Sequence, residues 1–419
     1  MCIMKRNKKK QKANKITAEE RKMEKLYYKV PYIKEFEAEI LSCEQAKDGG
    51  YWVVMDRTAF YPEGGGQPAD TGMLHFLDLN GTERCVHVTD TRERGEMVCH
   101  KIEEEILPGT LVHGKIDWEA RFLRMQEHSG EHIISGILHR RYGFDNVGFH
   151  MGTDEVTLDV NGVISMEELW EVENEANQIA EKNIPIRCYY PDEEMLHTLD
   201  YRSKKELTGA VRIVEIPDVD LCACCGIHVE RTGEIGMIKI TGMIHYKGGM
   251  RISMMCGSRA REDYERRIRQ MRKISVLLSA KPEELAAAVE RQKEILEEKE
   301  QDISSLYTKW QKMKLQTIQP AKRLLVREDD LSVVQLRQYA DALAKQEKGE
   351  IVLAIKKKEE NVFQYVLTSQ TQDMKVFGKA LKEHLHGNGG GSSKMQQGIF
   401  EGNDKEIRDG FESTECKEN

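Results

Sequence analysis

The sequence predicts an α+β protein of several domains: a small β-barrel, an α+β domain, a helical coiled-coil segment and a C-terminal α/β domain. Three observations support this prediction. The chain has 419 residues, more than the ~250–300 that one hydrophobic core usually supports. Short β-rich runs between turn residues come first, and helical periodicity replaces them near Trp118. A long charged heptad pattern then separates this part from a last block of mixed helices and strands.

The composition limits the class of protein. Hydrophobic residues make up 39% and charged residues 32% of the chain, and no apolar run approaches the ~18 residues that a membrane span needs. The N-terminus is basic but lacks the apolar segment of a secretory signal. Of the 10 cysteines, those between residues 222 and 256 are clustered, which indicates a metal or catalytic site in a reducing compartment. We therefore expect a cytoplasmic protein that has no membrane partner.

The first two predicted regions are a tail and a barrel. Residues 1–30 carry many more basic than acidic side chains and are expected to form a basic flexible tail. Residues 31–117 alternate short strands with Gly and Asn turns, as in a small barrel. One turn, Pro62–Pro68, contains three consecutive glycines. Glycines allow positive φ and let another chain or a ligand approach the backbone closely.

Residues 118–258 are predicted to form the α+β domain. Apolar residues at helical spacing indicate a helix over 119–140, and the Ser165/Glu168 pair is a capping box that opens a second helix to about Lys182. Strands are expected at residues 184–190, 211–216, 236–244 and 251–255.

Residues 259–319 are predicted to be helical, with Pro282 in the first turn of a long helix. Steps of four and three residues then mark a heptad seam: Leu285, Val289, Gln292, Leu296, Lys299, Ile303, Leu306, Trp310 and Met313. An antiparallel helical hairpin and a homodimer both satisfy this pattern.

Residues 320–419 are predicted to form the C-terminal α/β domain. The expected elements are a helix near 331–346, strands at 351–355 and 362–368, and a helix at 373–386. A glycine-rich run over residues 386–394 follows. Taken alone it is interpreted as a linker, although such a run can also form a backbone nest for phosphate.

A candidate metal site comes from two short patterns. H-x-x-x-H places two imidazoles on one face of the predicted helix, and a dense Cys/His segment contains C-x-x-x-H. Together they supply four N and S donors of the kind that Zn²⁺ prefers: His128, His132, Cys224 and His228. Cys222 and Cys225 are alternatives to Cys224, and a purely structural site is an alternative to a catalytic one. We predict one Zn²⁺ per chain.

The order of these motifs resembles a known family. Thr58–Gly72, Ile116–Arg121, the two metal patterns and the strand from Arg251 follow one another as in the editing module of alanyl-tRNA synthetase and the AlaX-type free-standing alanyl-tRNA editing proteins. The resemblance covers roughly residues 36–400. It implies that the α+β domain is a zinc-containing editing domain and that the last domain is DHHA1-like, as in the long AlaX form. The family's Cys-Gly-Gly-Thr-His reads Cys224-Cys225-Gly226-Ile227-His228 in this chain.

The resemblance implies hydrolysis of the ester in tRNA(Ala) that is mischarged with serine or glycine. An alanine pocket discriminates poorly against these amino acids, by only ~1–3 kcal/mol. A second site that binds the serine hydroxyl reverses the preference, because alanine leaves its polar groups unpaired. Thr58 and Gln67 are the candidates for this catalytic and recognition role. Zinc either activates water or holds the aminoacyl group.

Binding of tRNA is the last implied property. Residues 247–273 carry nine Lys/Arg against three acidic residues. The candidate contacts are Lys247, Arg251, Gly389, Gly390, Gly391 and Lys394. Two other functions remain as alternatives. A synthetase or ligase needs an ATP-binding domain ahead of the barrel, where only a short basic stretch is expected. A non-catalytic zinc-dependent RNA-binding or regulatory protein of the same fold is disfavoured by the four-donor set and the Gly64–Gln67 turn.

Overall fold

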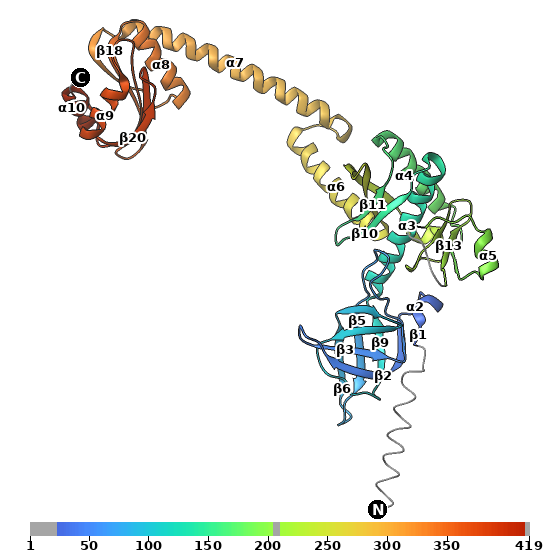
Figure 1. The fold of residues 1–419 in the computed structure, drawn as a ribbon. Coiled ribbons are helices and arrows are strands. Elements are labelled where there is room, and N and C mark those ends of the chain that lie inside the picture. The colour runs from blue at the N-terminus through green and yellow to red at the C-terminus, as the bar shows by residue number, and fades with distance from the viewer. Residues whose placement is uncertain (1–22, 204–209, 415–419) are drawn as a thin grey trace, which may run out of the picture. The chain divides into compact units, whose positions relative to one another are not determined.

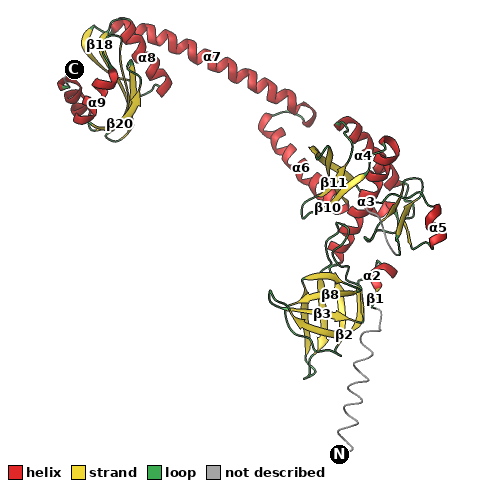
Figure 2. Ribbon diagram, in the orientation of Figure 1, coloured by secondary structure: helices red, strands yellow, loops and turns green. Residues whose placement is uncertain are grey.

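The computed structural model describes residues 23–203 and 210–414. The chain divides into two compact units, Met1–Arg272 and Lys273–Asn419, and Figures 1 and 2 show their helices and strands. The predicted basic tail lies outside the described residues up to residue 22. None of the helices in the described ranges has the length and apolar character that a membrane crossing requires.

The last residues of the predicted tail are part of the fold. β1 (Glu24–Lys25) pairs in parallel with β4 (Arg57–Thr58), and the short helix α2 (Leu26–Lys29) follows β1. Met23 and Tyr27 are buried in the core of the first unit. Burial of these two apolar side chains outweighs the charge of their neighbours, so the chain is ordered here rather than flexible.

A curled seven-stranded antiparallel sheet takes the place of the predicted small barrel. The strand order is β6-β5-β9-β2-β3-β8-β7. The strands are β2 (Glu35–Gln45), β3 (Tyr51–Met55), β5 (Gly72–Leu77), β6 (Glu83–Val88), β7 (Asp90–Arg94), β8 (Met97–Ile102) and β9 (Leu111–Ile116). β2 pairs with β9 through its first half and with β3 through its second, with a register shift between Ile40 and Ser42. Figure 2 shows the curl that follows. β6 pairs with β5, and β7 pairs with β8, so β6 and β7 are the two edge strands of the sheet. Because these edges are not paired with each other, the curled sheet is a half-barrel and not a closed barrel.

The α+β part of the first unit combines long helices with a four-stranded sheet. The predicted first helix is α3 (Trp118–Tyr142), which ends at the left-handed Gly143. The predicted capping box at Ser165 is confirmed and opens α4 (Met166–Glu181). The sheet order is β10-β11-β16-β15. These strands are β10 (Asn146–Met151), β11 (Val156–Val160), β15 (Ile238–Tyr246) and β16 (Gly249–Cys256).

A small three-stranded sheet follows α4 in the chain. It has the order β12-β13-β14, with β12 (Arg187–Tyr189), β13 (Ile213–Ile216) and β14 (Asp220–Ala223). Shorter elements surround it: α5 (Glu193–Thr198) and the 3₁₀ turn η1 (Thr232–Ile235). Helix α6 (Gly257–Leu278) then leads out of β16.

The second unit contains the long helix α7 (Leu285–Thr317), which the 3₁₀ turn η2 (Pro282–Glu284) precedes. Its five-stranded sheet has the order β17-β18-β19-β21-β20. The remaining elements are β17 (Ala321–Arg327), α8 (Val333–Lys345), β18 (Gly349–Glu359), β19 (Val362–Ser369), α9 (Met374–His384), β20 (His386–Gly391), β21 (Met395–Glu401) and α10 (Asp404–Ser413). The glycine-rich run, interpreted as a linker from its composition, is instead the edge strand β20, because its backbone pairs with β21.

The predicted heptad seam lies on α7. Its apolar members Val289, Leu296, Ile303, Leu306 and Met313 are exposed. Near the end of the helix, Trp310 packs on Tyr339 of α8 with ring centroids 5.1 Å apart. The seam therefore has one member that packs within the second unit and several that remain accessible.

Candidate metal centre

Helix α3 carries His128 and His132 one turn apart on the same face. Their rings lie with centroids 5.4 Å apart, and both side chains are buried. The helix can lie this deep because glycines stand where it meets its neighbours. A Cβ at Gly130 would overlap the Cys256 sulfur, and one at Gly136 would overlap the Val219 carbonyl. These two glycines set the depth of the histidine pair.

The other two donors come from the turn that follows β14. The Cys224 N–H donates to the Arg212 carbonyl at 3.0 Å. The Arg212 side chain in turn donates to the carbonyls of Cys224 and Gly226 at 3.0 and 2.8 Å. A Cβ at Gly226 would overlap the His128 ring, so only glycine allows this approach. Arg212 and Gly226 together bring the turn against α3.

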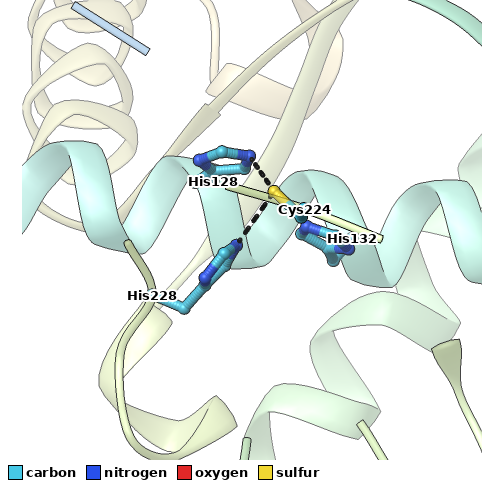
Figure 3. A group of neighbouring side chains, drawn as sticks. All are labelled: His128, His132, Cys224 and His228. Atoms are coloured by element: carbon cyan, nitrogen blue, oxygen red, sulfur yellow. Dashed lines mark hydrogen bonds between the residues drawn. The ribbon is translucent and has the colours of Figure 1, made fainter. Parts of the chain in front are cut away.

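Figure 3 shows the resulting cluster, with three imidazoles around the sulfur of Cys224. Cys224 Sγ lies 3.3 Å from His128 Nε2 and 3.8 Å from His228 Nε2. All four donor atoms lie within 4.8 Å of one another. A tetrahedral zinc with bonds of about 2.0 Å to nitrogen and 2.3 Å to sulfur holds such donors roughly 3.5 Å apart. The spacing of the donors therefore fits Zn²⁺.

Gln67 determines which nitrogen of His128 faces the cluster. The Ile227 N–H donates to Gln67 Oε1 at 3.2 Å, which identifies that atom as the amide oxygen. His128 Nδ1 lies 2.9 Å from the same oxygen and must be the donor. Its Nε2 is then free to bind a metal. The buried Gln67 Nε2 has no hydrogen-bond partner among the described residues, so one amide donor remains available.

Asp220 does the same for His132. Its Oδ2 lies 2.7 Å from His132 Nδ1, and its Oδ1 accepts from Arg202 at 2.8 Å. His132 Nε2 is buried and has no hydrogen-bond partner in the described part of the chain. A bound cation would satisfy this orphaned nitrogen. Sequence reasoning missed Asp220 and Arg202, because neither belongs to a spacing motif, although Asp220 lies two residues before the first clustered cysteine.

Electrostatics favour the metal-binding forms of two of the donors, Cys224 and His228. Burial by itself raises the pKa of Cys224, but His128 and the other two histidines outweigh it and lower this pKa well below its usual range. Burial lowers the pKa of His228 to about 3. Cys224 is therefore a thiolate and His228 a neutral imidazole, the forms that coordinate zinc. At His132, burial lowers the pKa, but the hydrogen bonds to Asp220 and Cys224 outweigh this effect and raise the pKa to about 10, so a metal ion would have to replace a proton on this ring.

The glycine-rich turn reaches this centre from the curled sheet. The carbonyl of Gly66 accepts from the Met151 N–H at 3.1 Å, and a Cβ at Gly66 would overlap the Phe149 carbonyl. Phe149 in turn lies against His128, with ring centroids 4.9 Å apart. Close backbone approach at Gly66, as expected for this turn, delivers Gln67 to His128.

A buried ion pair holds the same turn against the start of α3. Asp70 accepts from the Tyr61 N–H at 2.6 Å and from Arg121 Nε at 2.8 Å. Arg121 also donates to the Pro31 carbonyl at 3.1 Å. Both charged side chains are buried, so each would be costly without the other. This pair fixes the curled sheet to the helix that carries the histidines.

The alternatives for the thiol donor are placed differently. Cys222 is buried and groups with His132 and Asp220, in a group that does not contain His128 or His228. Cys225 is exposed, and its carbonyl accepts from the Tyr28 hydroxyl at 2.9 Å. Of the three neighbouring cysteines, Cys224 is the one that groups with all three histidines.

Thr58 lies in the core of the curled sheet. Val53 O lies 3.2 Å from His100 Nδ1, which must donate to this carbonyl. His100 Nε2 is then an acceptor, and the Thr58 hydroxyl donates to it at 2.8 Å. The same hydroxyl accepts from the Phe60 N–H at 3.1 Å. Its proton is thus committed to His100, whereas the Gln67 amide has a donor without a partner among the described residues.

The predicted nucleic-acid contacts fall in both units. Arg251 forms two hydrogen bonds to Asp159, at 2.6 and 2.8 Å, and Lys247 lies at the exposed turn between β15 and β16. In the second unit, Gly389, Gly390 and Gly391 lie on the exposed strand β20, and Lys394 follows it with an exposed side chain. Among these candidate contacts, Arg251 is therefore the residue whose charge is already paired with a carboxylate.

Comparison with known proteins relates these features to a family. The family model of tRNA synthetases class II (A) matches residues 3–120, and that of the threonyl and alanyl tRNA synthetase second additional domain matches residues 211–262. The alanyl-tRNA editing protein AlaX-L of Pyrococcus horikoshii is 29% identical over 92% of this chain and 97% of its own length. The chain is a homologue of AlaX-L.

Alanine–tRNA ligases are also similar to this chain. Those of Pyrococcus furiosus and Pyrococcus abyssi are 37% and 38% identical, over 64% of the chain. The chain spans only 29% of either ligase. Among solved structures, the C-Ala domain from Aquifex aeolicus alanyl-tRNA synthetase matches 22% of this chain and 89% of that chain, at 19% identity and a TM-score of 0.19. A TM-score this low does not support an assignment of fold.

Proposed function

We propose that this chain hydrolyses, in trans, the ester of tRNA(Ala) that carries the wrong amino acid, chiefly serine and secondarily glycine. The observation that carries the proposal is the four-donor cluster beside the unpaired amide donor of Gln67. The match to AlaX-L over nearly its full length supports the same function. One bound Zn²⁺ per chain, held by His128, His132, Cys224 and His228, is part of the proposal.

When bound, zinc supplies a Lewis acid that lowers the pKa of water or polarises the ester carbonyl. The protein's own groups would do the rest. Gln67 Oε1 and Asp220 hold the Nδ1 protons of His128 and His132, which keeps both imidazoles oriented. The buried surroundings of the histidines limit the number of waters that compete for the donors.

Gln67 is our candidate for recognition of the amino acid. Its Nε2 donor is buried and unpaired in the described structure, and a buried donor without a partner is costly. A serine hydroxyl can accept this hydrogen bond, whereas alanine has no atom to do so. The amide would then be satisfied by serine and not by alanine, which favours hydrolysis of the seryl ester; glycine would gain nothing from this contact, in line with its secondary place. Thr58, whose hydroxyl proton is used by His100, is the second candidate.

The competing function is a non-catalytic zinc-dependent RNA-binding protein of the same fold. A deacylation time course on seryl-tRNA(Ala), combined with metal analysis, separates the two. The wild type should contain one zinc and release serine, and His132→Ala should lose both, because one of four donors is gone. Full zinc without any deacylation would favour the binding protein instead. Full zinc in His132→Ala would refute the assignment of the donors.

Contact with the tRNA body would come from Lys247, Lys394 and the β20 glycines. The two lysine side chains are exposed, and so are the glycines. Lysine contacts with phosphate make binding fall with salt, which filter binding at two salt concentrations measures.

A homodimer through α7 would account for the exposed seam. Ile303 lies within this seam and is 58% exposed. Ile303→Lys should therefore lower the sedimentation coefficient without changing the zinc content. If the wild type already sediments as a monomer, and Ile303→Lys leaves the sedimentation coefficient unchanged, the dimer is refuted.

A further inference from the structure

The exposure of the four donors indicates that the metal centre is accessible from one side. His128, His132 and His228 are buried, and Cys224 is the donor that is partly exposed. Two further cysteines beside it, Cys188 and Cys225, are exposed. A substrate as large as the end of a tRNA must therefore approach from the side of these cysteines.

Tyr190 lies on this side. Cys188 Sγ is 3.9 Å from His228 Nδ1, whereas His228 Nε2 faces Cys224, so the side chain of Cys188 lies beside the His228 ring, on the edge away from the metal donor. Tyr190 is two residues further along the chain, directly after β12, and side chains two residues apart in an extended chain point to the same face. Its ring is 53% exposed. Tyr190 is therefore a large aromatic side chain whose exposure is not explained by packing of the hydrophobic core.

The titratable groups near Tyr190 give a second indication of where its ring lies, independent of the alternation of side chains along the strand. Partial burial raises the pKa of Tyr190, the Arg212 guanidinium opposes this rise, and the Cys225 and Cys188 thiols add to it. Arg212 holds the Cys224 turn and also lies over the ring of Tyr28, 5.1 Å from its centroid. Tyr190 thus lies near Cys188, Cys225 and the Arg212 side chain that holds the Cys224 turn.

We infer that the exposed ring of Tyr190 is the stacking platform for the adenine of the 3′-terminal nucleoside, the one whose ribose carries the amino acid. This inference rests on the proposed hydrolysis of aminoacyl-tRNA. Two residues of extended chain, roughly 6–7 Å, separate Tyr190 from Cys188, which lies beside the donor His228. That distance is on the scale of the ribose that joins the base to the ester. Stacking accepts any base by its face, and the ring would hold the ester toward the metal.

The test uses uncharged tRNA(Ala), so that it does not depend on hydrolysis. Binding of a transcript ending in CCA is compared with that of a transcript ending in CC, by fluorescence anisotropy with the full-length, zinc-loaded protein. Loss of one stacked base weakens binding by about 5- to 150-fold, so the wild type should prefer CCA by a factor in this range. Tyr190→Phe, which keeps the ring, should retain the preference, and Tyr190→Ala should bind both transcripts alike.

The matched control is Tyr189→Ala. Tyr189 precedes Tyr190 in the chain, pairs with Ile213 in the ladder and belongs to the opposite face of β12. It should keep the preference for CCA. If Tyr190→Ala keeps the preference while its zinc content is normal, or if Tyr190→Phe or Tyr189→Ala abolishes it, the platform is refuted. A wild type that binds both transcripts equally refutes it too. A wild type that prefers CCA through Tyr190 but deacylates no charged tRNA would leave the platform standing and refute the proposed function.

Discussion

Asp220 is the residue outside the donor set on which we expect zinc binding to depend most. It is buried between His132 Nδ1, at 2.7 Å, and Arg202, at 2.8 Å. Asp220→Asn keeps the size of the side chain and removes its charge. The amide oxygen can face only one of the two donors, so either Arg202 or His132 loses an acceptor.

The expected magnitude follows from these contacts. Partners of a ligand that lie outside the coordination shell typically account for 10- to 100-fold in metal affinity, or about 1.4–2.7 kcal/mol. Loss of the carboxylate also leaves the partly buried guanidinium of Arg202 unpaired, which should lower the free energy of unfolding of the variant. We therefore expect zinc to bind Asp220→Asn at least tenfold more weakly, with deacylation lost in proportion to the metal.

The assay is competition for zinc against a chromophoric chelator at fixed pH, with deacylation measured on the same samples. The matched control is Asp218→Asn, which makes the same chemical change two residues earlier in the chain. Asp218 is exposed and has a left-handed φ of 61° that asparagine accepts. It should bind zinc as the wild type does. Equal zinc affinity in Asp220→Asn and the wild type would show that the carboxylate does not orient His132 for a metal.

Four more predictions follow from other contacts. Gly226→Ala should lower zinc affinity at least tenfold, because its Cβ would overlap the His128 ring. The control is Gly242→Ala, which should bind zinc normally because a Cβ at Gly242 would meet nothing within 4 Å. Equal zinc affinities in the two variants would contradict the packing argument. Thr58→Val should lower the free energy of unfolding by about 1–3 kcal/mol, since it leaves the buried acceptor His100 Nε2 unpaired. The same variant should change the ratio of seryl- to alanyl-tRNA hydrolysis less than twofold. A larger fall in this ratio would return serine recognition to Thr58. Burial lowers the pKa of His100 from 6.5 to about 4. The unfolded chain therefore binds a proton more readily, and the free energy of unfolding should fall by about 3 kcal/mol as the pH falls from 7 to 4. Urea unfolding of the wild type and His100→Gln at both pH values checks this, and an equal fall in both would exclude His100 as the cause. Lys394→Ala should reduce the slope of log affinity for tRNA against log salt by about 0.9 if this lysine binds one phosphate; an unchanged slope would remove it from the interface.

Elements with a strong local pattern could be predicted from the sequence. The helix over 119–140 and the capping box at Ser165 depend on side chains three to four residues apart, and α3 and α4 confirm them. The glycine-rich run could not be predicted in this way, because its composition favours a linker. It forms β20 only because β21 supplies hydrogen-bond partners from elsewhere in the chain. The half-barrel also depends on pairing between distant strands, which turn residues alone do not encode.

The donors of the candidate site could be predicted because histidines four residues apart must share a helix face. Their supporting residues could not. Asp220 lies 88 residues from His132 in the chain, and Gln67 lies 61 residues from His128. Nothing in the local sequence specifies either contact, which depends on the position of α3 in the folded unit. Gln67 was found only through the family resemblance of its glycine-rich turn.

The supporting residues, rather than the donors, make this cluster suitable for a metal. Two histidines on a helix can each present either ring nitrogen, and a neutral imidazole carries its proton on one of them. In this chain an amide oxygen faces Nδ1 of His128, and a carboxylate faces Nδ1 of His132. Both acceptors keep the proton on Nδ1, so both Nε2 lone pairs are directed to the same side as Cys224. We therefore expect a change at Gln67 or Asp220 to alter the metal centre without removing a ligand. The two residues differ in one respect: Asp220 is fully used by His132 and Arg202, whereas Gln67 retains an unpaired amide donor. On the basis of this difference we propose that Asp220 supports metal binding alone, whereas Gln67 supports both metal binding and substrate recognition.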